Sequence, residues 1–165
     1  YYITKLDYCN TEEDVIALIE TLNKDEKVDG ILLQLPLPPH LNEKEIIEHI
    51  ALDKDVDGFT SCNMGRMLKG EECFIPCTPK GILTILSHFG VSTTGKRVTV
   101  IGRSDIVGKP MAVLLMGKGY DAVGDIDGES ITDRDVSYTP VPGGVGLMTV
   151  ASLMENTFIS RERRG

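Results

Sequence analysis

The residues with the clearest chemical potential lie in a loop near the C-terminal end of the chain. Residues 139–146 read Thr-Pro-Val-Pro-Gly-Gly-Val-Gly, and the apolar run 147–151 follows them directly. Glycine lets the main chain approach a ligand closely, proline fixes φ, and the following run can begin a helix whose free N–H groups face the ligand. The segment predicts a rigid loop that lies against a flat ligand. The alternative is an ordinary turn before a helix.

A second segment places one polar side chain inside an apolar run. Residues 29–40 contain Gln34 among leucines, and three prolines close the run. This pattern predicts a buried parallel strand over residues 31–35 that ends in a stiff loop. Ligands of α/β sheets gather at the carboxyl ends of the strands, so Gln34 is expected in a binding site. A glutamine that points away from an edge strand would give the same sequence.

A third segment predicts a site for the phosphates of a dinucleotide. Residues 97–101, of which the last four are β-branched, resemble a short strand, the turn Gly102-x-Ser104-x-x-x-Gly108 follows, and Pro110 suits the first turn of a helix. A strand, a glycine turn and a helix N-terminus together form an anion site. The turn differs from the usual G-x-G-x-x-G pattern, so by itself it is a weak signal.

These three segments occur in one order with two others, residues 55–59 (Asp-Val-Asp-Gly-Phe) and 74–81 (Phe-Ile-Pro-Cys-Thr-Pro-Lys-Gly). From residue 28 to residue 157 the chain resembles the methylenetetrahydrofolate dehydrogenase/cyclohydrolase family. The resemblance implies oxidation of 5,10-methylenetetrahydrofolate to 5,10-methenyltetrahydrofolate, then hydrolysis to 10-formyltetrahydrofolate. It implies NADP as cofactor, with NAD as the alternative. It also implies tetrahydrofolate ligands, a homodimer, a cytoplasmic location and a place in one-carbon metabolism that serves purine and amino-acid biosynthesis.

The resemblance implies an α/β fold with two domains. A folate-binding α/β domain would span residues 1–78, and a Rossmann-like NAD(P)-binding domain would span residues 79–146. The C-terminal helix, residues 147–165, would pack back on the first domain. In the family the catalytic lysine belongs to a Tyr-x-x-x-Lys helix ahead of the segment that begins this chain. We expect residues 1–5 to form a strand, so Lys5 is not assigned as that lysine.

The resemblance also implies roles for individual residues. Gln34 would bind the family lysine and help to place the hydrolytic water, and Asp57 would anchor the pterin ring. Turn chemistry at Asp57-Gly58 is the alternative for the aspartate. The predicted substrate-binding residues are Leu33, Gln34, Leu35, Asp57, Pro142, Gly143, Gly144, Val145 and Gly146. The predicted cofactor-binding residues are Gly102, Arg103, Ser104 and Gly108. Arg103 suits the 2′-phosphate of NADP, although a solvated arginine in a surface turn is as common.

Capping residues and apolar spacing predict the helices. The expected helices begin near Thr11, Asn42, Thr78, Met111 and Leu147. Pro79 suits the start of the third helix, and Gly90 would stop it.

The nucleotide-binding half is too short for its expected fold. Residues 117–138 offer only scattered apolar side chains, which cannot supply several buried parallel strands. We therefore predict a junction near Ala122 and Val123, where residues present in the family are missing. This leaves three functions open: the bifunctional enzyme, a monofunctional dehydrogenase of the same family, and a non-catalytic relative that binds folate or nucleotide.

Composition excludes other classes of function. The chain has 165 residues and a formal net charge of −8, which argues against a nucleic-acid surface. No apolar run approaches the roughly 20 residues needed to span a bilayer. Four cysteines without C-x-x-C spacing are expected to be free thiols, and no metal site is predicted, although Cys73 and Cys77 could act as weak ligands.

Overall fold

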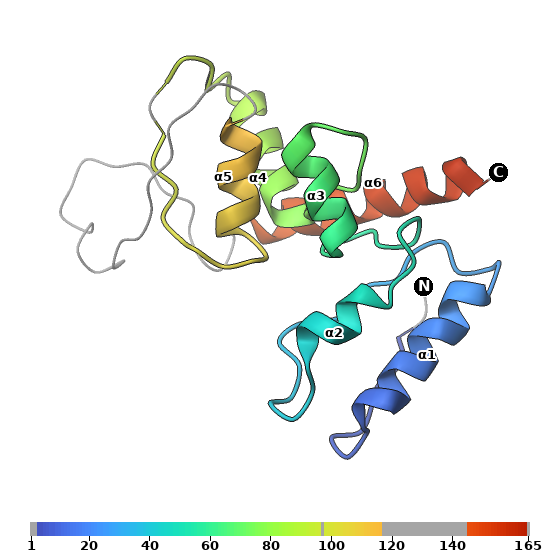
Figure 1. Ribbon diagram of the computed structural model, residues 1–165. Helices are drawn as coiled ribbons and strands as arrows, with labels where there is room; N and C mark the ends of the chain where they lie inside the picture. The colour runs from blue at the N-terminus through green and yellow to red at the C-terminus, as the bar shows by residue number, and fades with distance from the viewer. Residues whose placement is uncertain (1–2, 97, 117–144, 165) are drawn as a thin grey trace.

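The computed structural model describes residues 3–96, 98–116 and 145–164, and the helices within them form two groups (Figure 1). The helices are α1 (Glu12–Lys24), α2 (Glu43–Glu48), α3 (Ser61–Lys69), α4 (Cys77–His88), α5 (Gly108–Met116) and α6 (Gly146–Arg164). Helix α1 packs against α2, while α4 contacts both α5 and α6 and α3 contacts α5. None of these helices is both long and apolar enough to cross a bilayer.

Helix α1 begins as its sequence predicts. The Thr11 side chain accepts a hydrogen bond from Asp14 N, and the Asp14 carboxylate accepts one from Thr11 N, which completes a capping box. The helix buries Val15 and Ile19 in an apolar cluster with three isoleucines from the next segments, Ile31, Ile46 and Ile50. Asn42 caps α2 as expected, because its side chain accepts from Glu45 N. Apolar residues that recur at helical spacing in the sequence therefore form the core of this first group of helices.

The strand predicted over residues 31–35 is wrong. Among the described residues, Ile31 and Asp55 form an isolated parallel β-bridge, and Ile31 N donates to Lys54 O over 2.8 Å. The bridge does not extend, because the partner segment turns at once: Gly58 N donates to Asp55 O over 3.0 Å. Residues 32–35 therefore have no neighbour with which to form a ladder. Strands were also expected over residues 97–101 and 1–5, and the described residues of these segments, 98–101 and 3–5, form none.

The buried ammonium of Lys54 joins the bridge to the end of α1. Its Nζ donates to three main-chain carbonyls, those of Leu22, Asn23 and Asp25, over 2.7 to 2.9 Å. These carbonyls lie at the helix C-terminus, where they have no partner within the helix and where a cation is favoured. The first helix and the bridge are thereby held as one unit.

The Asp55 carboxylate organises the loop that follows the bridge. One oxygen accepts from Gly58 N and Phe59 N, and the other accepts from Thr60 N, Thr60 Oγ1 and Asn63 Nδ2, over 2.7 to 3.2 Å. The side chain of Asn63 then accepts from Phe74 N over 3.2 Å. Asp55 is 1% exposed, so a charged group is buried but fully hydrogen-bonded.

Helix α3 was not expected from the sequence. Thr60 caps it by accepting from Asn63 N over 3.3 Å, and Gly70 ends it with a φ of 70°. Both signals, a threonine at the N-cap and a glycine past the end, are present in the sequence. The helix is short, and its apolar residues are few, which is why spacing alone did not indicate it.

Helices α4 and α6 pack closely along their length. A Cβ at Gly81 would lie 3.0 Å from Met148 Cβ, so glycine is what permits this approach. Helix α4 begins at Cys77, with Pro76 at the N-cap, and not after Thr78 as predicted. Thr78 instead pairs with Thr149 of α6, with 3.0 Å between their hydroxyl oxygens. The predicted stop at Gly90 is confirmed, since that residue has a φ of 65° and α4 ends at His88.

The last turns of α6 contact the first group of helices. The Ser160 hydroxyl lies at hydrogen-bond distance from Asp29 O and Asp53 O, and Arg164 pairs with the Asp29 carboxylate. These residues lie next to the two halves of the β-bridge. The return of the C-terminal helix to the first part of the chain is therefore made by polar contacts.

The first prediction concerns the Asp55 carboxylate. Asp55→Asn should lower the free energy of unfolding by about 3 kcal/mol, because the amide loses charge-assisted hydrogen bonds and turns an NH₂ group toward main-chain donors. Urea denaturation measures the change. Asp53→Asn, at an exposed side chain, is the control and should unfold like the wild type. Equal stability of all three proteins would contradict this account of the loop.

Candidate functional site

Asp57 lies on the loop that Asp55 holds, next to the start of α4. The residue after it, Gly58, has a φ of 73°, and a Cβ there would lie 2.5 Å from Phe74 O. Glycine is therefore required at this position, both for its conformation and for the close approach of two main-chain segments. The loop is held on one side by Asp55 and on the other by the segment that leads into α4.

The Asp57 carboxyl is half-buried, and burial raises its pKa above the usual range for aspartate. A hydrogen bond from the Cys77 thiol opposes this shift in pKa, the Asp55 charge adds to it, and the Cys77 N–H opposes it again. Pro76 offers no side-chain cap to α4, and the Cys77 N–H at that helix N-terminus is one of the groups that lower the Asp57 pKa. A carboxyl group with a raised pKa on a rigid loop is typical of a binding or catalytic position.

Cys77 and Asn156 surround the main chain beside Asp57. Val56 O accepts from Asn156 Nδ2 over 2.8 Å, and the Cys77 sulfur lies 3.5 Å from the same oxygen. Burial and the neighbouring Asp57 charge raise the pKa of the Cys77 thiol, so this group stays protonated. All four cysteines are free thiols, as expected. Sequence analysis did not assign Asn156, since one asparagine within a helix gives no pattern.

Gln34 is exposed, and its Nε2 donates to the next carbonyl, that of Leu35, over 2.9 Å. Its neighbours Leu33 and Leu35 are half-buried. Gln34 follows Ile31 by three residues and Asp57 follows Asp55 by two, so the bridge joins the two segments that carry the predicted catalytic residues. Beyond the bridge the segment of Asp57 turns away, and among the described residues no contact joins Gln34 to Asp57.

The glycine and proline loop is described only at its end. Pro142, Gly143 and Gly144 lie outside the described residues, as does the predicted junction at Ala122 and Val123. Val145 is half-buried, and its carbonyl accepts from Thr149 N over 3.0 Å. Gly146 is the first residue of α6, one residue before the predicted start. The loop therefore leads directly into the helix that carries Asn156.

The predicted nucleotide turn is compact. A Cβ at Gly108 would lie 2.1 Å from Gly102 O, and Gly102 has a φ of 137°. The expected close approach at Gly108 is therefore present, since no other residue fits there. The Ser104 hydroxyl accepts from Val107 N and Gly108 N, each over 3.2 Å, and so caps the first turn of α5. Arg103 is exposed beside them.

Two family descriptions match this chain. Residues 2–57 match "Tetrahydrofolate dehydrogenase/cyclohydrolase, catalytic domain", and residues 76–121 and 116–165 match the NAD(P)-binding domain of the same family. The chain belongs to this family. It is 34% identical over 215 residues to the "Bifunctional protein FolD" of Moorella thermoacetica, which covers 98% of the chain and 77% of the relative. It is 39% identical over 202 residues to the protein of that name from Methanosphaerula palustris, and this match covers 90% of the chain and 72% of the relative.

Solved structures of the family have the same fold. The bifunctional enzyme FolD of Campylobacter jejuni matches with a TM-score of 0.87 and 33% identity, over 97% of this chain and 76% of that one. The Trypanosoma brucei enzyme, solved with NADP and an inhibitor, matches with a TM-score of 0.86 and 25% identity, over 99% of this chain and 76% of that one. The expected fold, a folate-binding α/β domain with an NAD(P)-binding domain, is therefore confirmed by relatives and not by strands formed in the described residues.

Part of the NAD(P)-binding domain of the relatives has no counterpart here. The Moorella match runs over 215 residues, although the whole chain has 165. The NAD(P)-binding domain matches in two pieces that meet at residues 116–121, next to the predicted junction. The relative thus carries internal residues that this chain lacks, while the predicted junction near Ala122 and Val123 stays a prediction.

The second prediction follows from the raised pKa of Asp57. The folded protein keeps this proton over a pH range in which the unfolded chain has lost it. The stability from this group is present in full below the ordinary aspartate pKa of about 4, and it is lost as pH rises through the folded-state pKa. Asp57→Asn cannot ionise, so its free energy of unfolding should decrease less than that of the wild type between about pH 4 and pH 7. Urea denaturation at both pH values tests this.

Asp7→Asn, at an exposed carboxyl, is the control for this experiment and should follow the wild type. Parallel pH dependence of Asp57→Asn and the wild type would show that the Asp57 carboxyl titrates normally in the folded protein.

The third prediction concerns the nucleotide turn. Gly108→Ala should lower the free energy of unfolding by about 2 kcal/mol, because its Cβ would overlap the Gly102 carbonyl and force the main chain apart. Gly65→Ala is the matched control: its Cβ would meet nothing within 4 Å, and alanine favours the α3 helix. The control should be as stable as the wild type or slightly more so. Similar losses in both variants would contradict the close approach described here.

Proposed function

We propose that this chain oxidises 5,10-methylenetetrahydrofolate to 5,10-methenyltetrahydrofolate with NADP and hydrolyses the product to 10-formyltetrahydrofolate. The observation that carries the proposal is Asp57, a half-buried carboxyl with a raised pKa on a loop fixed by Asp55. Its position agrees with that of the family motif in a chain matched by relatives named as bifunctional FolD proteins. A rigid acceptor of this kind suits the adjacent N–H groups of a pterin ring.

The folate side of the site would be formed around Asp57 and Gln34. Asp57 anchors the pterin through its carboxyl oxygens, and Leu33 and Leu35 offer apolar surface beside Gln34. The loop from Pro142 to Gly146 lines the rest of the ligand. Hydride transfer depends mainly on holding two rings in contact, so a fixed anchor supplies much of the rate. Gln34 is exposed, and its amide is free to reorient toward a water molecule, which suits the hydrolytic step.

On the cofactor side, the turn before α5 fits the phosphates of NADP. The N–H groups of Val107 and Gly108 already bind Ser104, which leaves the main chain of Gly102 to Ser104 and the exposed Arg103 for the dinucleotide. Arg103 suits a 2′-phosphate, and NAD is the alternative cofactor. When bound, the nicotinamide accepts the hydride, while the protein holds and orients both rings.

A second candidate function is folate binding without hydride transfer. It is favoured by the internal stretch that the relatives have and this chain lacks, because that stretch belongs to the NAD(P)-binding domain. A monofunctional dehydrogenase of the same family is the third candidate and would lack only the hydrolytic step. Direct titration with NADP separates the second candidate from the other two.

Further properties of the family are proposed with the activity. We propose a domain boundary near residue 78, with residues 79–146 binding the cofactor and 147–165 returning to the folate-binding part. We also propose a homodimer in the cytoplasm without a membrane partner, and the net charge of −8 argues against a nucleic-acid partner. The product, a formyl donor, serves the biosynthesis of purines and amino acids.

The fourth prediction separates the two steps. Asp57→Ala should weaken tetrahydrofolate binding by about tenfold or more, since pterin donors would be left unpaired at roughly 1–3 kcal/mol. Gln34→Ala should reduce hydrolysis of methenyltetrahydrofolate more than it reduces affinity. Calorimetry measures binding, NADPH absorbance follows the oxidation, and loss of the methenyl absorbance follows hydrolysis.

Unchanged binding and unchanged rates in both variants would refute the assignment of these residues. A wild-type chain that binds tetrahydrofolate but not NADP would replace the proposed activity by the second candidate.

A further inference from the structure

Asn156 is a buried polar residue in the middle of α6, and it binds main chain from two distant segments. It is 2% exposed. Its Nδ2 donates to Val56 O over 2.8 Å and to Ile75 O over 3.1 Å. Val56 directly precedes Asp57, and Ile75 belongs to the segment that leads into α4. One amide group thus joins the loop of the candidate site, the approach to α4 and the C-terminal helix.

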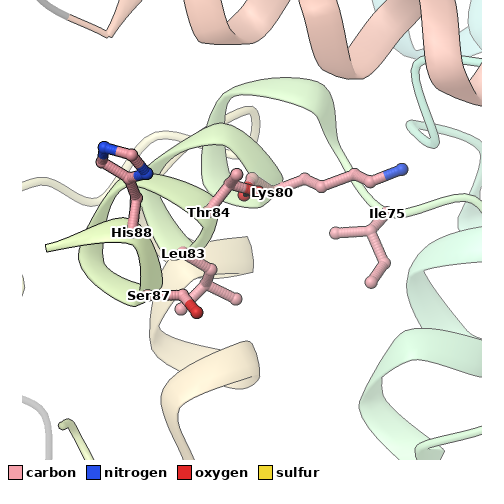
Figure 2. A pocket seen from close by; sticks show the side chains of 6 residues that line it. All are labelled: Ile75, Lys80, Leu83, Thr84, Ser87 and His88. Atoms are coloured by element: carbon pink, nitrogen blue, oxygen red, sulfur yellow. Dashed lines mark hydrogen bonds between the residues drawn. The ribbon is translucent and has the colours of Figure 1, made fainter. Parts of the chain in front are cut away.

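Lys80 fixes the orientation of this amide. Its Nζ donates to Asn156 Oδ1 over 2.8 Å and pairs with Glu155 over 2.9 Å. A cation on the oxygen side of the amide leaves the NH₂ group facing the two carbonyls. Figure 2 shows the Lys80 side chain extended toward Ile75, away from Leu83 and His88, which line the same hollow on α4.

The arrangement holds Asp57 from both sides. Asn156 binds the carbonyl before Asp57, and Asp55 binds the N–H after it, that of Gly58. Asn156 Nδ2 also lies 3.6 Å from the sulfur of Cys77, a residue that influences the pKa of the Asp57 carboxyl. We propose that Asn156 and Lys80 are positioning residues that hold the Asp57 carboxyl in its place beside Cys77. The proposal rests on the function assigned to Asp57 above.

The charged and titratable groups around Asp57 come from three elements. Asp55 lies on its own loop, Cys77 and Lys80 lie on α4, and Glu155 lies on α6. Glu155 is mostly exposed and contacts Lys80 from the solvent side. Asn156→Ala therefore tests the position of Asp57 without adding or removing any charge in its surroundings.

Asn156→Ala and Asn156→Asp test the proposal against a matched control on the same helix. Ser160→Ala also removes a buried polar side chain of α6 that binds two main-chain carbonyls, those of Asp29 and Asp53. Both sites should lose stability. Only the Asn156 variants should move Asp57, and Asn156→Asp should have the larger effect because it turns a carboxylate oxygen toward two carbonyls.

Two readouts are measured on the full chain. Carbon-13 NMR follows the titration of the Asp57 carboxyl and needs no activity. In Asn156→Ala its pKa should return toward the ordinary value of about 4, whereas Ser160→Ala should keep the wild-type pKa. Calorimetry with tetrahydrofolate should show a dissociation constant raised by about tenfold in Asn156→Ala, the effect of about 1.4 kcal/mol.

The Lys80 variants keep the test decisive if Asn156→Ala does not fold. Lys80→Met should also lower the Asp57 pKa; because loss of a nearby cation by itself raises a carboxyl pKa, a fall reports movement of the carboxyl, whereas Lys80→Arg and Glu155→Gln should keep the wild-type pKa. Wild-type titration of Asp57 in both Asn156→Ala and Lys80→Met would overturn the proposal. A shifted titration in a protein that binds no tetrahydrofolate would retain the positioning role and refute the proposed function instead.

Discussion

The Asp55 carboxylate is the interaction on which the rest of the site depends. It is buried and accepts hydrogen bonds from three main-chain N–H groups and two side chains. Through Thr60 and Asn63 it determines where α3 begins, and through Gly58 it fixes the turn after Asp57. A buried charge is tolerated only when its hydrogen bonds are complete, so the loop has one conformation that meets this condition. Asp57 takes its position from that conformation.

Polar contacts, more than apolar ones, connect the C-terminal helix to the first part of the chain. Asn156, Ser160 and Arg164 each bind a segment that lies close to the β-bridge. Hydrogen bonds are directional, so they define the register of a helix more sharply than apolar packing does. The apolar side chains on another face of α6 are exposed, namely Leu147, Val150, Met154 and Phe158. The orientation of α6 follows from its buried polar face.

Two different physical effects shape Asp57 and the turn before α5: burial of a carboxyl group at Asp57, and close approach of main-chain segments at the turn. At Asp57, burial destabilises the ionised carboxyl, which lowers the stability of the folded protein at neutral pH. At Gly102 and Gly108, the absence of side chains brings two main-chain segments together ahead of a helix N-terminus. At Gly58 and Gly108 a Cβ would lie 2.5 Å or less from a main-chain oxygen, so both positions require glycine.

The sequence by itself determined the family, most helices and the site motifs. Caps at Thr11 and Asn42 and the stop at Gly90 are local signals, because each concerns groups a few residues apart. Tertiary structure alone decided the rest. The apolar run 31–35 suited a strand, but a strand needs a partner, and the segment beside Ile31 turns away after one bridge. No sequence pattern singled out Asn156, and only packing brought it to Val56, 100 positions away. Contacts at that separation depend on how whole elements meet, and no local pattern in the sequence encodes them.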